Sequence, residues 1–157
     1  MKTTLNSIRE HSPCPDGWRK LLAHLGKNRA DDEPLAIITI LDSNGLEDAL
    51  WCLRAVDGHD RELRLYAVWC ARQVQHLMTD PRSIAALDVA ERFANGNATQ
   101  AELDTARAAA GVAARAAARD AAVAGVAATA AAWATAWVSA GVAQAIKLRE
   151  ICAEVTT

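Results

Sequence analysis

The chain has 157 residues, of which 52% are hydrophobic and 23% are charged, and its formal net charge is −2. This length and composition predict a folded domain with a sizeable core and exclude general disorder, which goes with few apolar residues and high net charge. The small negative charge argues against direct binding of nucleic acid, which usually needs a basic domain or stripe.

The amino-terminal segments carry helix start and stop signals. Asp16 is predicted to cap a helix that contains Trp18 and ends at Gly26. The charged residues 27–33 that follow are expected to form a loop. Residues 35–41 are the only strand-like run, and they are short enough to be a buried helix instead.

Further along the chain, four polar side chains stand at expected helix N-caps: Asn44, Asp60, Asp80 and Thr99. Asn44 has Glu47 three residues later, as in a capping box, and Pro81 follows Asp80 at a first-turn position that proline favours. The helices predicted from these caps cover 46–56, 60–78, 81–95 and the region from 99 onward.

The carboxy-terminal part is rich in alanine. Half of the residues from Ala101 to Ile146 are alanine, and none from 121 to 146 is charged. Alanine is the strongest helix former, and the segment 99–102 (Thr-Gln-Ala-Glu) reads as a capping box. A single helix from there to Cys152 would be about 75 Å long. We therefore expect a break near 120–125 and two helices folded into a hairpin.

The uncharged stretch 121–146 is long enough to span a bilayer, which gives a membrane-associated protein as one alternative. Its residues are mostly small or polar, however, rather than the large aliphatic ones that drive insertion. The amino terminus has no apolar signal-peptide region. We expect a cytoplasmic protein with no membrane contact, in which Cys52 and Cys70 are buried and unpaired.

Catalytic motifs are scarce in this sequence. It contains no nucleophile elbow, phosphate-binding loop or dinucleotide fingerprint. The pair His59–Asp60 resembles the metal ligands of helical HD-type phosphohydrolases, which gives a metal-dependent hydrolase as the alternative function. Such a site needs further ligands, for which the candidates are His24, Asp80, Asp88 and Asp104. A solvated turn that caps a helix also explains the pair, so no catalytic residue is predicted.

Zinc binding is not expected either. His11–Cys14 and Cys70–His76 do not provide two close ligand pairs of the spacing that structural zinc sites use. No metal and no cofactor are therefore predicted.

Two tryptophans, Trp133 and Trp137, stand one helical turn apart in the alanine-rich region. One reading is that they fill gaps between packed helices. The other is that they anchor an interface, where tryptophan is enriched. Because the surrounding stretch has little polar surface, a second copy of the chain is a possible cover, and we expect a homodimer.

Two stretches of this chain and its alanine-rich tail carry a family resemblance. The stretches are LDSNGLEDALWCLRA (41–55) and RLYAVWCA (64–71). Together with the tail they resemble an alanine-rich family of bacterial and phage proteins labelled immunity proteins. The resemblance extends over most of the chain from His11 onward. It assigns no active residues.

These observations predict an all-α, single-domain helical bundle of six or seven helices. Residues 1–98 would form helices of mixed composition, and residues 99–154 would form the alanine-rich hairpin. The expected function is non-enzymatic inhibition of another protein by binding it. The partner is a bacterial toxin, in an immunity role, or a bacterial defence complex, in a phage anti-CRISPR-like role. The predicted partner-binding residues lie in two mixed-charge loops: Asp31, Asp32, Glu33, Asp57, His59 and Asp60.

Overall fold

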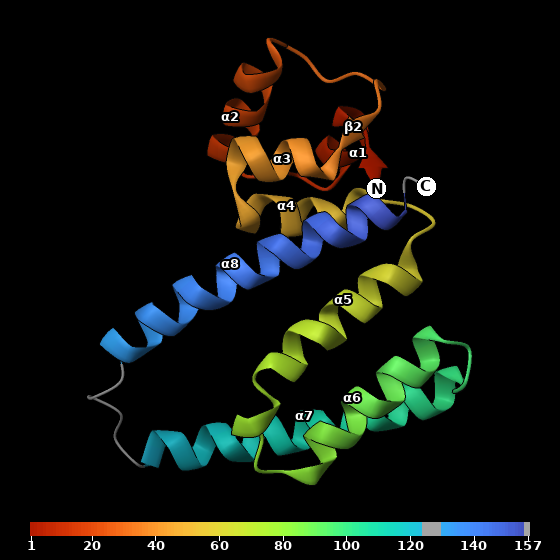
Figure 1. Cartoon of the computed structure of the whole chain (residues 1–157), viewed down its shortest axis with the longest axis vertical. Coiled ribbons are helices and arrows are strands. Elements are labelled where there is room, and N and C mark those ends of the chain that lie inside the picture. The colour runs from red at the N-terminus through yellow and green to blue at the C-terminus, as the bar shows by residue number, and fades with distance from the viewer. Residues whose placement is uncertain (124–129, 156–157) are drawn as a thin grey trace. The chain divides into compact units, whose positions relative to one another are not determined.

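The structure is a computed structural model that describes residues 1–123 and 130–155, with side chains described for 1–116 and 140–155 (Figure 1). The described chain contains eight α-helices, two short 3₁₀ helices and one two-stranded sheet, which confirms the predicted all-α class. It divides into two compact units, Met1–His59 with Ala140–Thr157, and Asp60–Ser139, called here the first and second units. The compositional boundary at 98/99 lies inside the second unit, and the single-domain organisation stays a prediction.

The first unit contains the amino-terminal elements and the carboxy-terminal part of α8 (Ala130–Glu154). In chain order its elements are β1 (Lys2–Thr3), α1 (Leu5–Glu10), α2 (Pro15–Leu25), β2 (Leu35–Ala36), α3 (Ile37–Asn44), α4 (Leu46–Cys52) and η1 (Leu53–Ala55). The strands β1 and β2 pair antiparallel, with Lys2 opposite Ala36. The sequence did not predict this sheet, because two-residue strands leave no alternating pattern. The strand-like run 35–41 proves to be mostly helix α3.

Aliphatic side chains fill the core of the first unit. Its largest fully buried residues come from distant parts of the sequence: Leu5, Ile8, Ile37, Ile40, Leu148 and Cys152. Thr3 is buried too, and its hydroxyl donates a hydrogen bond to the carbonyl oxygen of Ala55. Helix α8 is held to the same unit by an ion pair between Arg149 and Asp42.

The predicted cap of α2 was placed two residues too late. The N-cap is Cys14, whose Sγ accepts a hydrogen bond from the backbone N–H of Gly17 at 3.3 Å, and Pro15 occupies the first turn. Asp16 lies inside that turn and pairs with Arg19. The predicted end is confirmed, since Gly26 adopts a left-handed conformation with φ of 65° that favours glycine.

The second unit contains α5 (Asp60–Gln73), η2 (Gln75–Leu77), α6 (Pro81–Ala94) and α7 (Gln100–Val123), together with the start of α8. Within it, α6 packs against both α5 and α7. Asp60, predicted as the cap of α5, is instead the first residue of the helix and lies in its first turn. The helix ends at Gln73 rather than Met78, and a 3₁₀ turn covers part of the remainder. Helix α6 begins and ends where the sequence predicts, with Asp80 as its N-cap.

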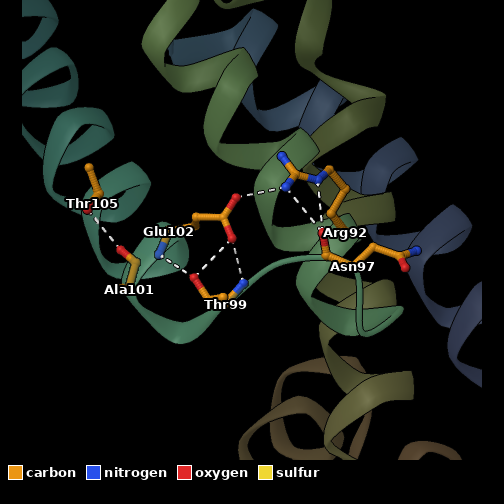
Figure 2. Close-up of polar contacts among 6 residues, drawn as sticks. All are labelled: Arg92, Asn97, Thr99, Ala101, Glu102 and Thr105. Atoms are coloured by element: carbon orange, nitrogen blue, oxygen red, sulfur yellow. Dashed lines mark hydrogen bonds and ion pairs between the residues drawn. The ribbon is translucent and has the colours of Figure 1, made fainter.

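The capping box at the start of α7 is confirmed (Figure 2). The backbone N–H of Glu102 donates to Thr99 Oγ1 at 3.2 Å, and the backbone N–H of Thr99 donates to Glu102 Oε2 at 2.7 Å. The other carboxylate oxygen of Glu102 accepts from Arg92 of α6 at 2.8 Å. Arg92 also donates to the carbonyl oxygen of Asn97 in the connecting turn. One carboxylate thus starts α7 and joins it to α6.

The alanine-rich region forms two helices, as predicted. Helix α7 ends at Val123 and α8 begins at Ala130. The intervening 124–129 and the side chains of Trp133 and Trp137 lie outside the described residues. The packing of α7 against α8 as a hairpin stays a prediction, because α8 is divided between the two units and its described side chains all belong to the first. No helix in the described part of the chain combines the length and apolar character that crossing a membrane requires.

Candidate functional site

The first unit contains a pocket of about 200 Å³ formed by residues of α1 to α4 and the segment before α2. Its walls are mainly apolar, with Ile8, Pro13, Leu21 and Ile40 among the lining residues. The indole rings of Trp18 and Trp51 also line it, and both tryptophans are half-buried. The polar lining comes from the remaining residues: Cys14, Gly17, Asn44, Glu47, Asp48 and Cys52.

Asn44 forms hydrogen bonds to two other residues that line the pocket. Its side-chain amide donates to the carbonyl oxygen of Gly17 at 2.8 Å and to Asp48 Oδ2 at 2.7 Å. This corrects the predicted role of Asn44 as a cap, because the N-cap of α4 is Gly45, which has no side chain to form a capping bond. Asn44 instead ties α2 to the carboxylate of α4.

The close approach of α2 and α4 requires glycine at position 17. A Cβ atom added to Gly17 would lie 2.6 Å from Asp48 Oδ2 and 3.1 Å from Cys14 Sγ. The first distance is shorter than any ordinary contact, so a larger residue would displace the Asp48 carboxylate. The sequence Gly17–Trp18 therefore places a backbone and a large aromatic ring side by side at the pocket.

The charged groups of the pocket lining are both acidic. Glu47 is exposed and Asp48 is half-buried, and they occupy the first turn of α4. Acidic residues at this place also interact favourably with the positive end of the helix dipole. Among the described residues, neither carboxylate forms an ion pair. The Arg54 guanidinium lies over the ring of Trp51, a lining residue of the pocket, 4.3 Å from its centroid.

The thiols of the pocket differ in exposure. Cys14 is exposed, whereas Cys52 is buried. Burial, together with the negative charge of Asp48, raises the pKa of the Cys52 thiol to about 12. A thiol with that pKa is protonated at neutral pH and is a poor nucleophile. Cys52 is therefore a packing residue, as the sequence predicts.

All four cysteines are free. Cys70 was expected to be buried, but it is only half-buried on α5; burial still raises its pKa. Cys152 is buried in the first unit, and its pKa is raised for the same reason.

The acidic loop, which contains Asp31, Asp32 and Glu33, was predicted to bind a partner. Its three acidic side chains form ion pairs or hydrogen bonds within the first unit. Lys27 Nζ pairs with Asp31 Oδ2 at 2.7 Å and with Glu33 Oε2 at 2.6 Å. The hydrogen bond from Lys27 lowers the pKa of Asp31. Asp32 accepts a hydrogen bond from Asn6 at 2.9 Å. The loop therefore has a defined conformation, and Lys27 offsets much of its negative charge.

The second predicted group includes the point in the sequence, between residues 59 and 60, where the first unit gives way to the second. Asp57 is exposed, His59 is half-buried and ends the amino-terminal part of the first unit, and Asp60 begins α5 of the second. Among the described residues, no hydrogen bond or ion pair links Asp57 to the acidic loop. Whether either group binds a partner stays a prediction.

Of the four extra metal ligands considered for an HD-type site, the three aspartates have other contacts. Asp80 pairs with Arg82 at 2.6 Å, Asp88 pairs with Arg72 at 2.8 Å, and Asp104 accepts from Gln100 at 2.7 Å. In the described ranges, no three histidine, cysteine, aspartate or glutamate side chains are grouped as metal ligands would be.

Sequence reasoning did not find the pocket. Trp18 and Asn44 were each assigned to one helix, Trp51 was given no role, and none of the three was assigned to a site. The Gly17–Trp18 pair and the adjacent acids Glu47 and Asp48 are visible in the sequence. They indicate a pocket only once α2 and α4 are known to lie together. The chain matches no protein-family model, no curated protein and no solved structure.

Proposed function

We propose that this chain acts by binding another protein, with the pocket of the first unit as the anchor site. The observation that carries the proposal is the composition of the pocket: two half-buried tryptophans and two acidic residues line a cavity of about 200 Å³. Tryptophan is enriched among residues that dominate binding energy, and such residues cluster in pockets that a partner's side chain fills. Binding of this kind would make the chain an inhibitor rather than an enzyme.

The acidic loop has a supporting role in this proposal. Asp31, Asp32 and Glu33 lie in the same unit as the pocket. Exposed charges around an interface raise the association rate and select partners by complementary charge, although each contributes little affinity. We extend this role to the exposed Asp57 and to Asp60 at the start of α5. The partner that this charge pattern suits has a basic surface.

The family resemblance supplies the classes of partner for the proposal, namely a bacterial toxin or a bacterial defence complex. Both would place the protein in the cytoplasm. The alternative, a metal-dependent hydrolase using His59 and Asp60, has no specific observation in its favour. Replacing His59 by Ala is expected to leave inhibition and partner binding nearly unchanged. Loss of inhibition with retained partner binding would instead support the hydrolase.

The direct test compares two charge reversals in an affinity capture from host lysate. Glu47→Lys places a cation at the pocket, whereas Glu33→Lys makes the same change of charge in the acidic loop. We expect the partner to be captured by the native chain, lost with Glu47→Lys and retained at reduced level with Glu33→Lys. Circular dichroism confirms that both variants are folded.

Two outcomes would contradict the proposal. One is equal capture by the native chain and Glu47→Lys, which would show that the pocket is not the anchor. The other is a captured protein that the chain binds without any effect on that protein's activity. Purified components and a titration of the partner's activity separate this second outcome from inhibition.

Self-association is part of the same proposal. Val142 and Ile146 of α8 are exposed, with 58% and 54% of their surfaces accessible, and they lie one helical turn apart. Exposed aliphatic pairs of this kind suit contact with a second copy. We expect a homodimer by light scattering, and Val142→Ser with Ile146→Ser is expected to weaken it. A strict monomer at micromolar concentration would remove the homodimer from the proposal.

A further inference from the structure

Resting on the proposed function, we propose that the pocket of the first unit binds the guanidinium group of an arginine side chain presented by the partner protein. The residues that line the pocket are mainly apolar, its two charged residues are acidic, and it is lined by one tryptophan from α2 and one from α4. An arginine side chain has matching parts: an apolar stem and a flat, positively charged end.

The size of the pocket suits one side chain. A cavity of about 150 Å³ in another protein holds a benzene molecule. The arginine side chain has a similar number of heavy atoms, so the 200 Å³ here has room for it. Nucleotides and most cofactors need larger pockets, of roughly 300 Å³ or more. The pocket is therefore an anchor for a single residue rather than a site for a large metabolite.

The charges around the pocket favour a cation. Glu47 and Asp48 form no ion pair within the described part of the chain, so both carboxylates can interact with an incoming positive charge. Two cations lie next to the lining, and both already have contacts. Lys20 donates to the carbonyl oxygen of Asn44 at 3.3 Å, and Arg54 stacks on Trp51. The Asp48 carboxylate is held in place by Asn44, so a cation meets an oriented acceptor.

Arginine fits this arrangement better than lysine does. A guanidinium group is planar, is weakly hydrated, stacks on aromatic faces and can donate two parallel hydrogen bonds to a carboxylate. The chain itself contains one such aromatic stacking interaction, between the Arg54 guanidinium and the Trp51 ring. A ligand guanidinium would use the ring of Trp18 together with Glu47 and Asp48.

The test uses a small probe, N-acetyl-arginine-N-methylamide, and its neutral isostere, N-acetyl-citrulline-N-methylamide. The chain has five tryptophans, and each indole N–H gives its own signal in a ¹H–¹⁵N NMR spectrum. Substituting Trp18 or Trp51 by Phe identifies the two pocket signals. We expect the arginine probe to shift these two signals with a Kd of order 1 mM, and the citrulline probe to bind at least tenfold more weakly.

Three variants and a second cation define the chemistry. Asp48→Asn keeps an oxygen that can accept the hydrogen bond from Asn44, and Glu47→Gln keeps the length of the side chain. Each is expected to weaken arginine binding about five- to tenfold, which corresponds to about 1 kcal/mol. Glu150→Gln on α8 removes the same charge outside the pocket and is expected to change binding less than twofold. The lysine analogue of the probe should bind more weakly than the arginine probe.

Several results would overturn the inference. Equal binding of citrulline would show that the pocket recognises shape rather than charge. Equal binding of the lysine analogue would show no preference for guanidinium, and shifts outside the two pocket tryptophans would place the probe elsewhere. Absence of any shift would also refute it. The capture experiment is independent: loss of partner with Glu47→Lys but no arginine binding leaves the proposed function standing and removes only the arginine anchor.

Discussion

The two units of this protein are held together in different ways. The first unit buries aliphatic side chains from α1, α3 and the end of α8, among them Leu5, Ile37 and Leu148. In the described part of the second unit, the buried side chains are few: Tyr66, Val68, Leu103 and Ala113. Its helices are connected instead by polar contacts that lie partly in solvent. The difference shows that helices that bury few large side chains need other contacts to fix their packing.

The arginines of the second unit supply those contacts. Arg72 of α5 pairs with Asp88 at 2.8 Å and with Glu91 at 2.7 Å, both on α6. Arg61 of α5 donates to Asn95 at 2.8 Å, and Arg64 lies over the ring of Phe93, 4.8 Å from its centroid. The charge of these arginines is thus used within the chain, whereas Glu47 and Asp48 of the first unit form no ion pair with any residue whose side chain is described.

The largest expected effect is in the core of the first unit. Ile37 is completely inaccessible to solvent. Replacing it by Ala removes buried methylene and methyl groups and leaves a cavity, so we expect the free energy of unfolding to fall by about 3 kcal/mol. Urea unfolding followed by circular dichroism measures this. A loss below about 1 kcal/mol would mean that the core of the first unit is loosely packed.

A smaller, salt-dependent effect is expected in the second unit. Arg72→Ala removes the two ion pairs to α6 and a hydrogen bond to Gln75, and should cost about 1.5 kcal/mol at low salt. High salt should reduce this difference, because partly exposed ion pairs are screened. The effect of Ile37→Ala should hardly change with salt. Equal salt dependence of the two variants would contradict the comparison of the units.

The capping box of α7 should contribute somewhat less. Thr99→Ala removes the side-chain oxygen that accepts from the backbone N–H of Glu102, and is expected to cost about 1 kcal/mol. Thr99→Ser keeps that oxygen and serves as the matched control, with stability close to the native chain. Thermal unfolding of the two variants gives the comparison. Equal destabilisation by Ala and Ser would assign the effect to the lost methyl group instead.

The smallest effect concerns acid pH. A side-chain hydrogen bond from Arg82, with a further bond from its backbone N–H, lowers the pKa of Asp80 to about 2 from an ordinary 3.8. Because the folded pKa is depressed, the stabilisation is present above about pH 3.8 and is lost as the pH falls towards 2. Arg82→Gln should move the pKa of Asp80 up towards 3.8, as measured by an NMR titration of its carboxyl carbon. An unchanged pKa would exclude Arg82 as the cause.

The sequence predicted best what depends on neighbouring residues. The caps at Asp80 and Thr99 and the end of α2 at Gly26 involve groups within a few positions of one another, and all three are confirmed. The Cys14 cap was missed because a thiol is an unusual cap and Asp16 is a better one by residue type. Pro15 favours the first turn of a helix, so α2 begins before Asp16 despite the preference of aspartate for the cap position.

The candidate pocket could not be predicted, for a physical reason. The bond from Asn44 to the carbonyl oxygen of Gly17 spans 27 positions, and it exists only because Gly17 lets α2 approach α4. Nothing in the local pattern distinguishes this use of Asn44 from a helix cap. The sheet was missed for a related reason, since β1 and β2 are two residues long and more than 30 positions apart.

The central claim is that the first unit presents the binding site while the polar groups of the second unit serve its own packing. Hydrogen exchange of the chain, alone and with its captured partner, tests this most directly. We predict that the partner slows exchange in α2 and α4, around Trp18 and Trp51, and leaves α6 and α7 nearly unchanged. Protection confined to α5–α7, with α2 and α4 exchanging as in the free chain, would contradict the account.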